Sequence, residues 1–333
     1  MAILERLHHR HVNKPYIVSG MAACNMAEAY GYQVYDAYHP SQFSVDNEMR
    51  LRYSSLWLLK YLRYYKKCKA IARKFIQSDE KGLVVSDEDF ASVSVGHEMK
   101  RKCILITDIV KTSFIKTRLL SIFESKMNKS MQDMIRGCNR VIIPDDGEDQ
   151  GNISYVGPIV RNVTIHNRSE LRKRLGMNKR TIVVSIGGTD SGRFLINKVI
   201  TVHQRLRKRL DTDLYIISGP SLTLKNSDND FKNIGSVENF HEYIYASDLV
   251  ISLAGRSTID ESTVYGTPGI FIPIKNHFEQ EENARLMGYK YEDIFRLESL
   301  IKDKINASGS RSDVNVDQSG AQKAADIIAE YSN

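Results

Sequence analysis

The chain has 333 residues, of which 42% are hydrophobic and 26% are charged, values typical of a globular protein with two domains of ordinary size. No stretch holds the roughly 18 uninterrupted apolar residues of a membrane-spanning helix, and the opening MAILERLHHRH lacks the features of a signal peptide. These features argue against an integral membrane protein and predict a cytoplasmic one. The net charge of +7 favours an anionic partner such as a phosphate group or an acidic lipid headgroup.

The cysteines give no sign of a metal or redox site. They are scattered without the C-x-x-C spacing, at positions 24, 68, 103 and 138. We therefore expect reduced thiols, and neither a metal nor another cofactor.

The first half of the chain alternates between predicted strands and helices. Short apolar runs predict strands at residues 16–20, 33–35, 82–86, 103–107 and 140–144. Helical patterns occur at residues 1–11, 22–30 and 117–136. Such alternation predicts a parallel sheet covered by helices. This domain begins within a helix, so we expect it to lack its first strand.

An acidic cluster follows the predicted strand at 82–86. It contains Asp87, Glu88 and Asp89. Open α/β sheets bind ligands at the carboxyl ends of their parallel strands. Asp87 and Asp89 are therefore candidate catalytic residues.

A basic and aromatic stretch lies at residues 49–76, where nine Lys or Arg residues occur and no acidic one. Its leucines and tyrosines recur at helical spacing. One interpretation is a helix that lies on an anionic membrane surface. The other is a surface helix whose apolar stripe packs on its own domain. We expect no nucleic acid to bind.

The second half repeats the alternation after a connection marked by Gly157 and Pro158. Strands are predicted at residues 155–161, 181–186, 214–218, 233–235, 249–253 and 269–273. Helices are predicted at residues 169–175, 193–210, 239–246 and 321–331. The expected division is a first domain at 1–154, a second at 155–318, and a last helix at 319–333 that crosses back to the first domain.

Two glycine-containing turns of the second half each join a strand to a helix. Such a turn can bind an anion, because the first N–H groups of a helix lack partners and the helix dipole adds positive potential. Neither turn has the spacing of a Walker or dinucleotide-binding loop, which argues against an NTPase and a dehydrogenase. The candidate phosphate-binding residues are Gly187, Gly188, Thr189, Gly255, Arg256, Ser257 and Thr258.

Other polar residues of this half complete a candidate nucleotide-sugar site. Arg161 can contribute a charged hydrogen bond to phosphate. Glu261 can accept hydrogen bonds from ribose hydroxyls beside that phosphate. The candidates for binding the sugar are His277, Glu279, Gln280 and Asn283. Each of these residues is also compatible with a hydrated strand end or helix start.

Three segments resemble the C-terminal domain of family 28 glycosyltransferases, and in particular its archaeal MurG-like subgroup. They are SIGGTDSG, DLVISLAGRSTIDESTVYGTPGIFIPI and HFEQEENA. The resemblance is specific over residues 155–290 and general over residues 1–150. It implies the GT-B fold, in which two Rossmann-like domains face each other across a cleft.

The resemblance also implies roles for single residues. Glu261 matches the glutamate that holds the ribose hydroxyls, and Arg161 matches an arginine that contacts phosphate. The turn from Gly255 to Thr258 matches the one that faces the diphosphate. The other matches are the cleft glycines Gly187 and Gly188 and the donor-sugar residues Glu279, Gln280 and Asn283.

The family members begin with a strand and a glycine-rich loop whose histidine is a candidate base. This sequence begins at the helix that follows that loop, so Asp87 or Asp89 becomes the candidate base. The implied function is an inverting, metal-independent glycosyltransferase that moves a sugar from a nucleoside diphosphate, expected to be UDP, to a lipid-linked or other acceptor hydroxyl. The alternatives are a nucleotide-sugar hydrolase or epimerase, and a catalytically impaired relative that binds membranes peripherally.

Overall fold

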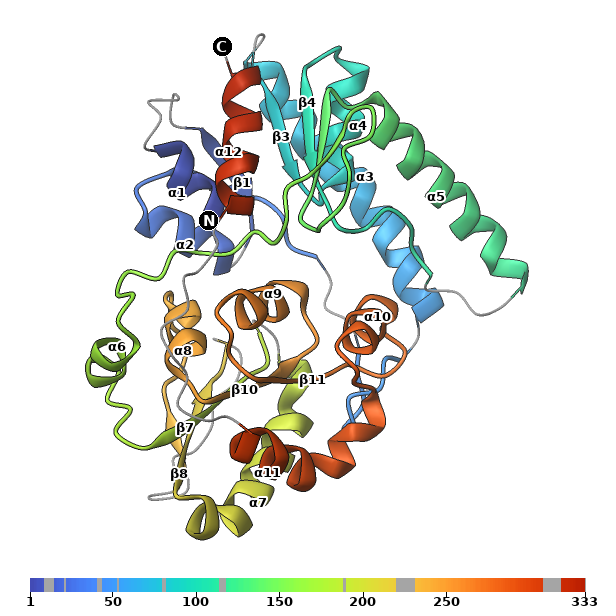
Figure 1. Ribbon diagram of the computed structural model, residues 1–333. Helices are drawn as coiled ribbons and strands as arrows, with labels where there is room; N and C mark the ends of the chain where they lie inside the picture. The colour runs from blue at the N-terminus through green and yellow to red at the C-terminus, as the bar shows by residue number, and fades with distance from the viewer. Residues whose placement is uncertain are drawn as a thin grey trace. The chain divides into compact units, whose positions relative to one another are not determined.

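The computed structural model describes residues 1–8, 15–20, 22–40, 44–52, 54–79, 82–113, 118–187, 190–219, 231–307 and 319–332. The chain forms two compact units (Figure 1). Unit 1 comprises Met1–Ser41, Tyr53–Val160 and Gln318–Asn333, and unit 2 comprises Gln42–Arg52 and Arg161–Asp317. The segment 42–52, which was expected in the first domain, therefore packs with unit 2.

The strands of unit 1 form two parallel sheets. A two-stranded sheet pairs β1 (Tyr16–Ser19) with β2 (Gln33–Asp36). A four-stranded sheet has the order β3 (Val84–Asp87), β4 (Cys103–Ile106), β5 (Arg140–Ile143) and β6 (Ile153–Tyr155). The described helices of this unit are α1 (Ala2–His8), α2 (Ala22–Ala29), α3 (Ser54–Ser78), α4 (Phe90–Glu98), α5 (Arg118–Gly137) and α12 (Ser319–Tyr331).

Hydrophobic side chains cover both faces of the four-stranded sheet, because successive residues of a strand point to opposite faces. On one face Leu105 and Val141 pack with Phe90 of α4 and Met131 of α5. On the other face, Ile104 and Ile142 pack against residues of α1 and α12: Leu7, Ala324, Ala325 and Ile328. The last helix is thus part of the core of unit 1.

Unit 2 is built on one five-stranded parallel sheet. Its strand order is β11 (Gly269–Ile272), β10 (Leu249–Leu253), β7 (Arg180–Ser185), β8 (Thr212–Ile217) and β9 (Lys232–Asn233). Its described helices are α6 (Arg168–Arg174), α7 (Arg193–Leu210), α8 (Phe240–Ala246), α9 (Arg256–Val264), α10 (Phe278–Leu286) and α11 (Leu297–Ala307). Two 3₁₀ turns, η1 (Asp190–Gly192) and η2 (Tyr291–Arg296), precede α7 and α11. The predicted α/β class with parallel sheets is confirmed.

Some elements differ from the prediction. The strand expected at 155–161 was wrong, because β6 ends at Tyr155 and Gly157 adopts a φ of 79°, a left-handed conformation that breaks an extended strand. Helix α4 was not predicted, since its sequence FASVSVGHE is poor in strong helix formers. Asp89 nevertheless starts this helix by accepting hydrogen bonds from two backbone N–H groups.

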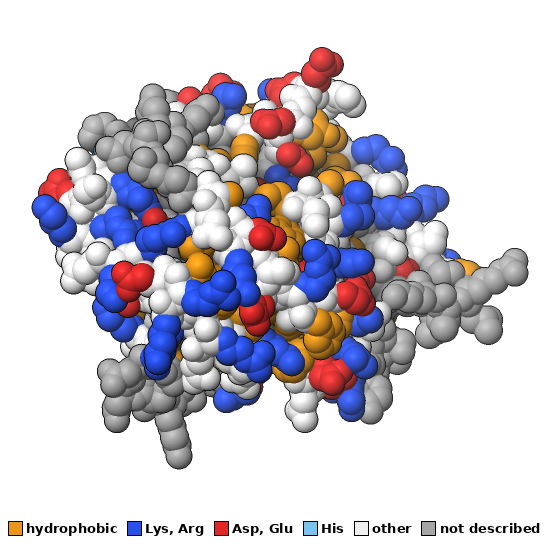
Figure 2. Space-filling view, turned by 60° about the horizontal axis from the view of Figure 1, so that its bottom comes forward, with side chains coloured by type: hydrophobic (Ala, Val, Ile, Leu, Met, Phe, Trp, Pro, Cys, Tyr) orange, Lys and Arg blue, Asp and Glu red, His pale blue; other side chains and the backbone are white. Residues whose placement is uncertain are grey.

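The excess positive charge is dispersed on the face that Figure 2 shows, where Lys and Arg side chains alternate with Asp and Glu. Surface ion pairs of this chain include Arg285 with Glu282 and Lys302 with Glu298. Among the described helices, none has both the length and the apolar composition required to cross a membrane.

Candidate ligand site in unit 2

The two glycine turns lie at the same edge of the unit 2 sheet. Ser185 at the end of β7 is in register with Ser252 of β10, and Leu253 is in register with Ile272 of β11. The turns after β7 and β10 therefore open at the carboxyl edge, where parallel sheets bind ligands. The structure brings together the two turns that the sequence singled out.

The glycines of these turns border open space. Gly187 has a φ of 73°, a conformation that favours glycine, whereas Gly255 has an ordinary extended backbone. A Cβ atom added to either residue would meet no heavy atom within 4 Å. A ligand can thus approach the backbone closely at both positions. Gly188 and Thr189 lie outside the described residues.

Helix α9 presents its N-terminus at the second turn. Its N-cap residue is Gly255, which has no side chain to accept hydrogen bonds from the N–H groups of the first turn. Ser257 is exposed, Thr258 is half-buried, and Arg256 places its Nε 2.9 and 3.0 Å from the carboxylate oxygens of Asp260. The helix dipole and the backbone N–H groups favour an anion at this end.

Glu261 is a buried carboxylate one turn further along α9. Its side chain is 9% exposed, and its Oε1 lies 3.5 Å from Nε of Arg161, whose side chain is 13% exposed. Burial raises the pKa of Glu261 to about 7, an effect that Arg161 opposes and Asp260 reinforces. The carboxyl group can therefore change its protonation state near neutral pH.

Arg161 is held in place through both its side chain and its backbone. Its Nη1 donates a hydrogen bond to the carbonyl oxygen of Glu238 at 2.6 Å. Its own carbonyl oxygen accepts one from the hydroxyl of Tyr265 at 2.8 Å. The guanidinium group is thus positioned before any ligand binds.

The start of α10 carries the predicted sugar-binding residues. His277 caps the helix, since its Nδ1 accepts from the backbone N of Gln280 at 3.5 Å. Burial lowers the pKa of His277 to about 4, so the imidazole is neutral at pH 7.

The amide side chains of α10 also brace the surrounding turns. Oε1 of Gln280 accepts from the backbone N of Ile274 at 3.0 Å. Nδ2 of Asn283 donates to the carbonyl oxygen of Ala254 at 3.2 Å, directly before Gly255. These two residues therefore connect the α10 segment to the rest of the site, whereas Glu279 is half-buried at the helix start.

Two neighbours of Arg161 were not identified from the sequence. Tyr265 is fully buried, and its hydroxyl fixes the backbone of Arg161. Nε2 of His241 lies 2.9 Å from the carbonyl oxygen of Asn162. Burial and the positive charge of Arg161 lower the pKa of His241 to about 4. Tyr265 lies within the segment DLVISLAGRSTIDESTVYGTPGIFIPI, but no role was expected for it, and His241 lies outside the three segments.

The acidic residues of unit 1 differ in their surroundings. Asp89 accepts hydrogen bonds from the backbone N atoms of Ala91 and Ser92 and from the hydroxyl of Tyr38 at 3.2 Å, so it serves the local structure. Asp87 ends β3 and is exposed. Protein atoms packed around the Asp87 carboxyl nevertheless limit its hydration and raise its pKa, and the charge of Asp108 adds to this effect.

Helix α3, which carries most of the basic stretch, packs on unit 1, whereas Arg50 and Arg52 belong to unit 2. Cys68 and Ala72 are buried, and the hydroxyl of Tyr65 donates to the carbonyl oxygen of Phe90 at 3.3 Å. Lys69 and Arg73 both pair with Glu98 of α4. These contacts agree with the interpretation of a surface helix packed on its own domain.

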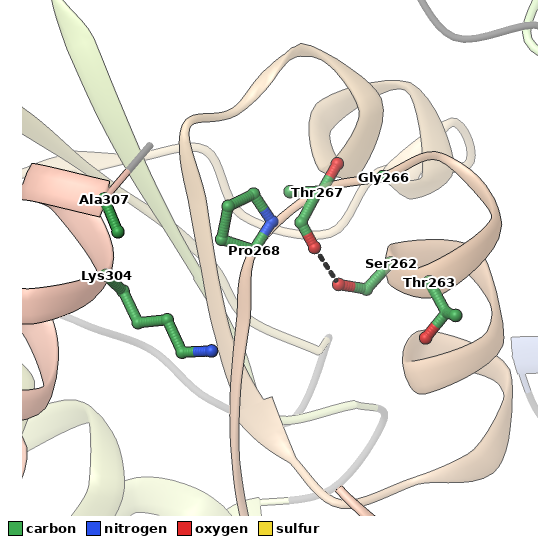
Figure 3. A pocket seen from close by; sticks show the side chains of 7 residues that line it. All are labelled: Ser262, Thr263, Gly266, Thr267, Pro268, Lys304 and Ala307. Atoms are coloured by element: carbon green, nitrogen blue, oxygen red, sulfur yellow. Dashed lines mark hydrogen bonds between the residues drawn. The ribbon is translucent and has the colours of Figure 1, made fainter. Parts of the chain in front are cut away.

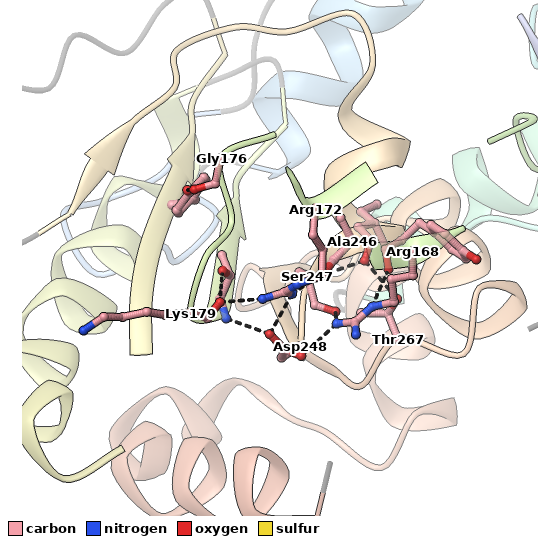
Figure 4. Close-up of polar contacts among 12 residues, drawn as sticks. Arg168, Arg172, Gly176, Lys179, Ala246, Ser247, Asp248 and Thr267 are labelled. Atoms are coloured by element: carbon pink, nitrogen blue, oxygen red, sulfur yellow. Dashed lines mark hydrogen bonds and ion pairs between the residues drawn. The ribbon is translucent and has the colours of Figure 1, made fainter. Parts of the chain in front are cut away.

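A buried polar cluster lies at the opposite, amino edge of the unit 2 sheet (Figure 4). Asp248, directly before β10, contacts Arg168 at 2.7 Å and Arg172 at 2.9 Å, and accepts from the backbone N of Thr181 at 2.7 Å. Despite the burial, these donors hold the pKa of Asp248 below its usual range. The cluster fastens α6 to the sheet and is remote from the glycine turns.

A pocket of about 330 Å³ also lies away from those turns, at the C-terminal end of α9 (Figure 3). Ser262 and Lys304 are among its lining residues. The hydroxyl of Ser262 donates to the carbonyl oxygen of Thr267 at 2.7 Å. This end of the helix presents carbonyl groups, so it lacks the features that favour an anion at the other end.

The chain is similar in sequence to known glycosyltransferases. Residues 181–327 match the glycosyltransferase family 28 C-terminal domain. The chain is similar to an uncharacterized glycosyltransferase of Methanosarcina acetivorans, with 26% identity over 239 residues that cover 64% of this chain and 60% of that protein. It is also similar to the UDP-N-acetylglucosamine–N-acetylmuramyl-(pentapeptide) pyrophosphoryl-undecaprenol N-acetylglucosamine transferase of Carboxydothermus hydrogenoformans. That match has 31% identity over 131 residues, or 36% of this chain and 34% of that protein.

A solved structure extends the similarity to the whole chain. It is that of the glycosyltransferase SsfS6 of Streptomyces sp. SF2575 complexed with thymidine diphosphate. The TM-score is 0.62 at 12% identity, and the match covers 99% of this chain and 94% of that one. At this identity the similarity shows a common fold, and function has to be argued from the site. The matched region spans less than two thirds of the length of the curated relatives.

Proposed function

We propose that this chain, whose residues 181–327 match the glycosyltransferase family 28 C-terminal domain and which has the two-domain GT-B fold, transfers a sugar from a nucleoside diphosphate to an acceptor hydroxyl. Unit 2 binds the donor, and UDP is its nucleotide. The function of the Carboxydothermus relative, whose name includes a UDP-sugar donor and an undecaprenol-linked acceptor, supports this choice.

The observation that carries the proposal is the position of Glu261 and Arg161 beside the N-terminus of α9. A diphosphate at the glycine turns receives backbone N–H groups and the positive end of the helix dipole. Arg161 adds a charged donor close by. The Glu261 carboxylate accepts hydrogen bonds from the ribose hydroxyls, and its burial strengthens those bonds.

The same groups favour departure of the nucleotide. Negative charge develops on the diphosphate as the glycosidic bond breaks, and positioned N–H groups and Arg161 stabilise it without a metal ion. The acceptor hydroxyl has to lose a proton during the attack, which requires a general base. We assign that role to Asp87, because Asp89 is occupied as a helix cap. Direct attack by the acceptor inverts the configuration at the anomeric carbon.

The name of the Carboxydothermus relative and the charges of α3 support a choice of acceptor class. We propose a lipid-linked acceptor reached at the cytoplasmic face of an anionic membrane. Besides the paired Lys69 and Arg73, α3 carries exposed cations on the solvent side: Lys60, Arg63, Lys66, Lys67 and Lys74. Such cations attract anionic lipid, with a contribution of about 1 kcal/mol each at low salt.

Calorimetric titration with UDP, thymidine diphosphate and GDP tests the donor assignment. We expect saturable binding of UDP to the intact chain, with the other nucleotides weaker. Absence of binding by all three at millimolar concentration would refute the proposal. Turnover of a UDP-sugar without any acceptor would instead support the hydrolase or epimerase alternative.

A further inference from the structure

The segment 44–52 forms a small hairpin that packs on unit 2. Its strands meet at the bridge between Val45 and Leu51, and the backbone N of Arg52 donates to the carbonyl oxygen of Ser44 at 2.8 Å. Asp46 closes the turn, because its Oδ1 accepts from the backbone N atoms of Glu48 and Arg50, each at 2.9 Å. We name residues 44–52 the strap. It is the short blue segment beside α10 in Figure 1.

The strap pairs with the chain that leaves β11. The backbone N of Lys275 donates to the carbonyl oxygen of Met49 at 3.0 Å, and the backbone N of Leu51 donates to the carbonyl oxygen of Lys275 at 2.8 Å. This is a parallel bridge between Arg50 and Lys275. The strap thus makes a strand-like contact with the segment that follows β11, the edge strand of the sheet.

Side chains strengthen this contact. Met49 is 0% exposed and has a φ of 60°, a conformation that is unfavourable for a residue other than glycine and that persists only where the surroundings fix it. The hydroxyl of Tyr291 donates to the carbonyl oxygen of Glu48 at 2.5 Å. Lys275 lies over the ring of Tyr291 with its Nζ 5.0 Å from the ring centre.

The strap contacts Lys275, which lies just before the candidate sugar-binding segment. Lys275 is followed by Asn276, with a φ of 68°, and then by the helix cap His277. On the other side of Lys275, Ile274 donates its backbone N to Gln280. A shift of Lys275 therefore moves both His277 and Gln280.

We propose that the strap positions the donor-sugar segment of unit 2, with Met49 and Tyr291 as the positioning residues. This inference rests on the proposed function, since it concerns the sugar end of the donor site. The nucleotide end, formed by Gly255 and Glu261, belongs to α9 and is linked to the α10 segment by the hydrogen bond from Asn283 to Ala254. Loss of the strap contact should therefore weaken binding of the sugar much more than binding of the nucleotide.

The test compares Met49→Ala and Tyr291→Phe with the control Asn47→Ala, at an exposed strap position. We expect the affinity for UDP-N-acetylglucosamine, used as a probe, to fall about 10-fold in the two variants, as for a lost hydrogen bond, while that for UDP stays within about twofold. The control should match the wild type for both ligands. Equal losses for the two ligands would reduce the strap to a general stabiliser of unit 2 and overturn the proposal.

Amide hydrogen exchange provides a second measurement that needs no ligand. In both variants the Lys275 amide, which donates to Met49, should exchange at least about 10-fold faster, while the amides of β7 and β10 keep their protection. Unchanged protection at Lys275 would contradict the inference even where no nucleotide binds. The two proposals can fail separately. If the wild type binds neither ligand but Lys275 exchanges faster in the variants, the proposed function is refuted and the contact between the strap and Lys275 is supported.

Discussion

Nε of Arg161 lies 3.5 Å from Oε1 of Glu261, although 100 residues of sequence separate the two. Both side chains are largely buried at the carboxyl edge of the unit 2 sheet. The pKa of Glu261 rises to about 7 because burial outweighs the attraction of Arg161. This pair links the stability of unit 2 to its proposed donor binding.

The first prediction concerns pH and stability. The folded state binds the Glu261 proton more tightly than the unfolded state does, so this group lowers stability as pH rises from about 4.5 to about 7. Glu261→Gln removes this dependence. Urea unfolding should show equal stability of variant and wild type near pH 4.5 and a variant more stable by about 2–4 kcal/mol at pH 8.

The exposed Glu282, which pairs with Arg285, offers a matched control. Glu282→Gln should follow the wild type at both pH values. A Glu261→Gln variant whose pH dependence equals that of the wild type would show that this carboxyl group does not titrate near neutral pH.

The second prediction uses the open space beside Gly255. Its φ of −79° and ψ of 138° suit any residue, and an added Cβ meets no heavy atom within 4 Å. Gly255→Ala should therefore leave the melting temperature unchanged while it weakens UDP binding by at least about 10-fold, since the methyl group occupies ligand space. Unaltered UDP affinity would place the diphosphate elsewhere.

The third prediction separates the two acidic residues of unit 1. Asp87→Asn should lower kcat by at least about 100-fold through loss of the general base, without a change in donor affinity. Asp89→Asn should keep activity, because asparagine caps helices about as well as aspartate does. UDP release in the presence of an acceptor measures both variants. If Asp87→Asn were as active as Asp89→Asn, Asp87 would not be the general base.

The fourth prediction concerns the Asp248 cluster. Asp248→Asn leaves Arg168 and Arg172 without their buried counter-charge and should cost about 2–4 kcal/mol of stability. The lowered pKa of Asp248 means that the wild-type advantage is present above the ordinary aspartate pKa and is lost as pH falls through the folded value. Urea unfolding measures this effect, with the exposed Asp303→Asn as control. UDP affinity should remain unchanged, because the cluster lies at the other edge of the sheet.

The sequence predicted the parts of this molecule that local patterns determine. Apolar runs predicted β7, β8, β10 and β11, and the glycine turns after β7 and β10 indicated the edge where the site lies. Contacts between distant segments were beyond such reasoning. Neither the hydrogen bond from Tyr265 to Arg161 nor the pairing of Met49 with Lys275 leaves a periodic pattern in the chain. The capping role of Asp89 was not predicted either, because the sequence of helix α4 is poor in strong helix formers.

The role of the Glu261 carboxylate at the ribose is the central claim. Its most direct test is the affinity of UDP and of 2′,3′-dideoxy-UDP for the wild type and for Glu261→Gln, measured well above the pKa of Glu261 of about 7, where its carboxyl group is ionised. Hydrogen bonds to a charged group contribute about 1.5–3 kcal/mol, so the wild type should bind UDP about 10- to 100-fold more tightly than the dideoxy compound. The variant should bind both weakly and with nearly equal affinity. An undiminished preference for UDP in the variant, or none in the wild type, would contradict the assignment of Glu261 to the ribose hydroxyls.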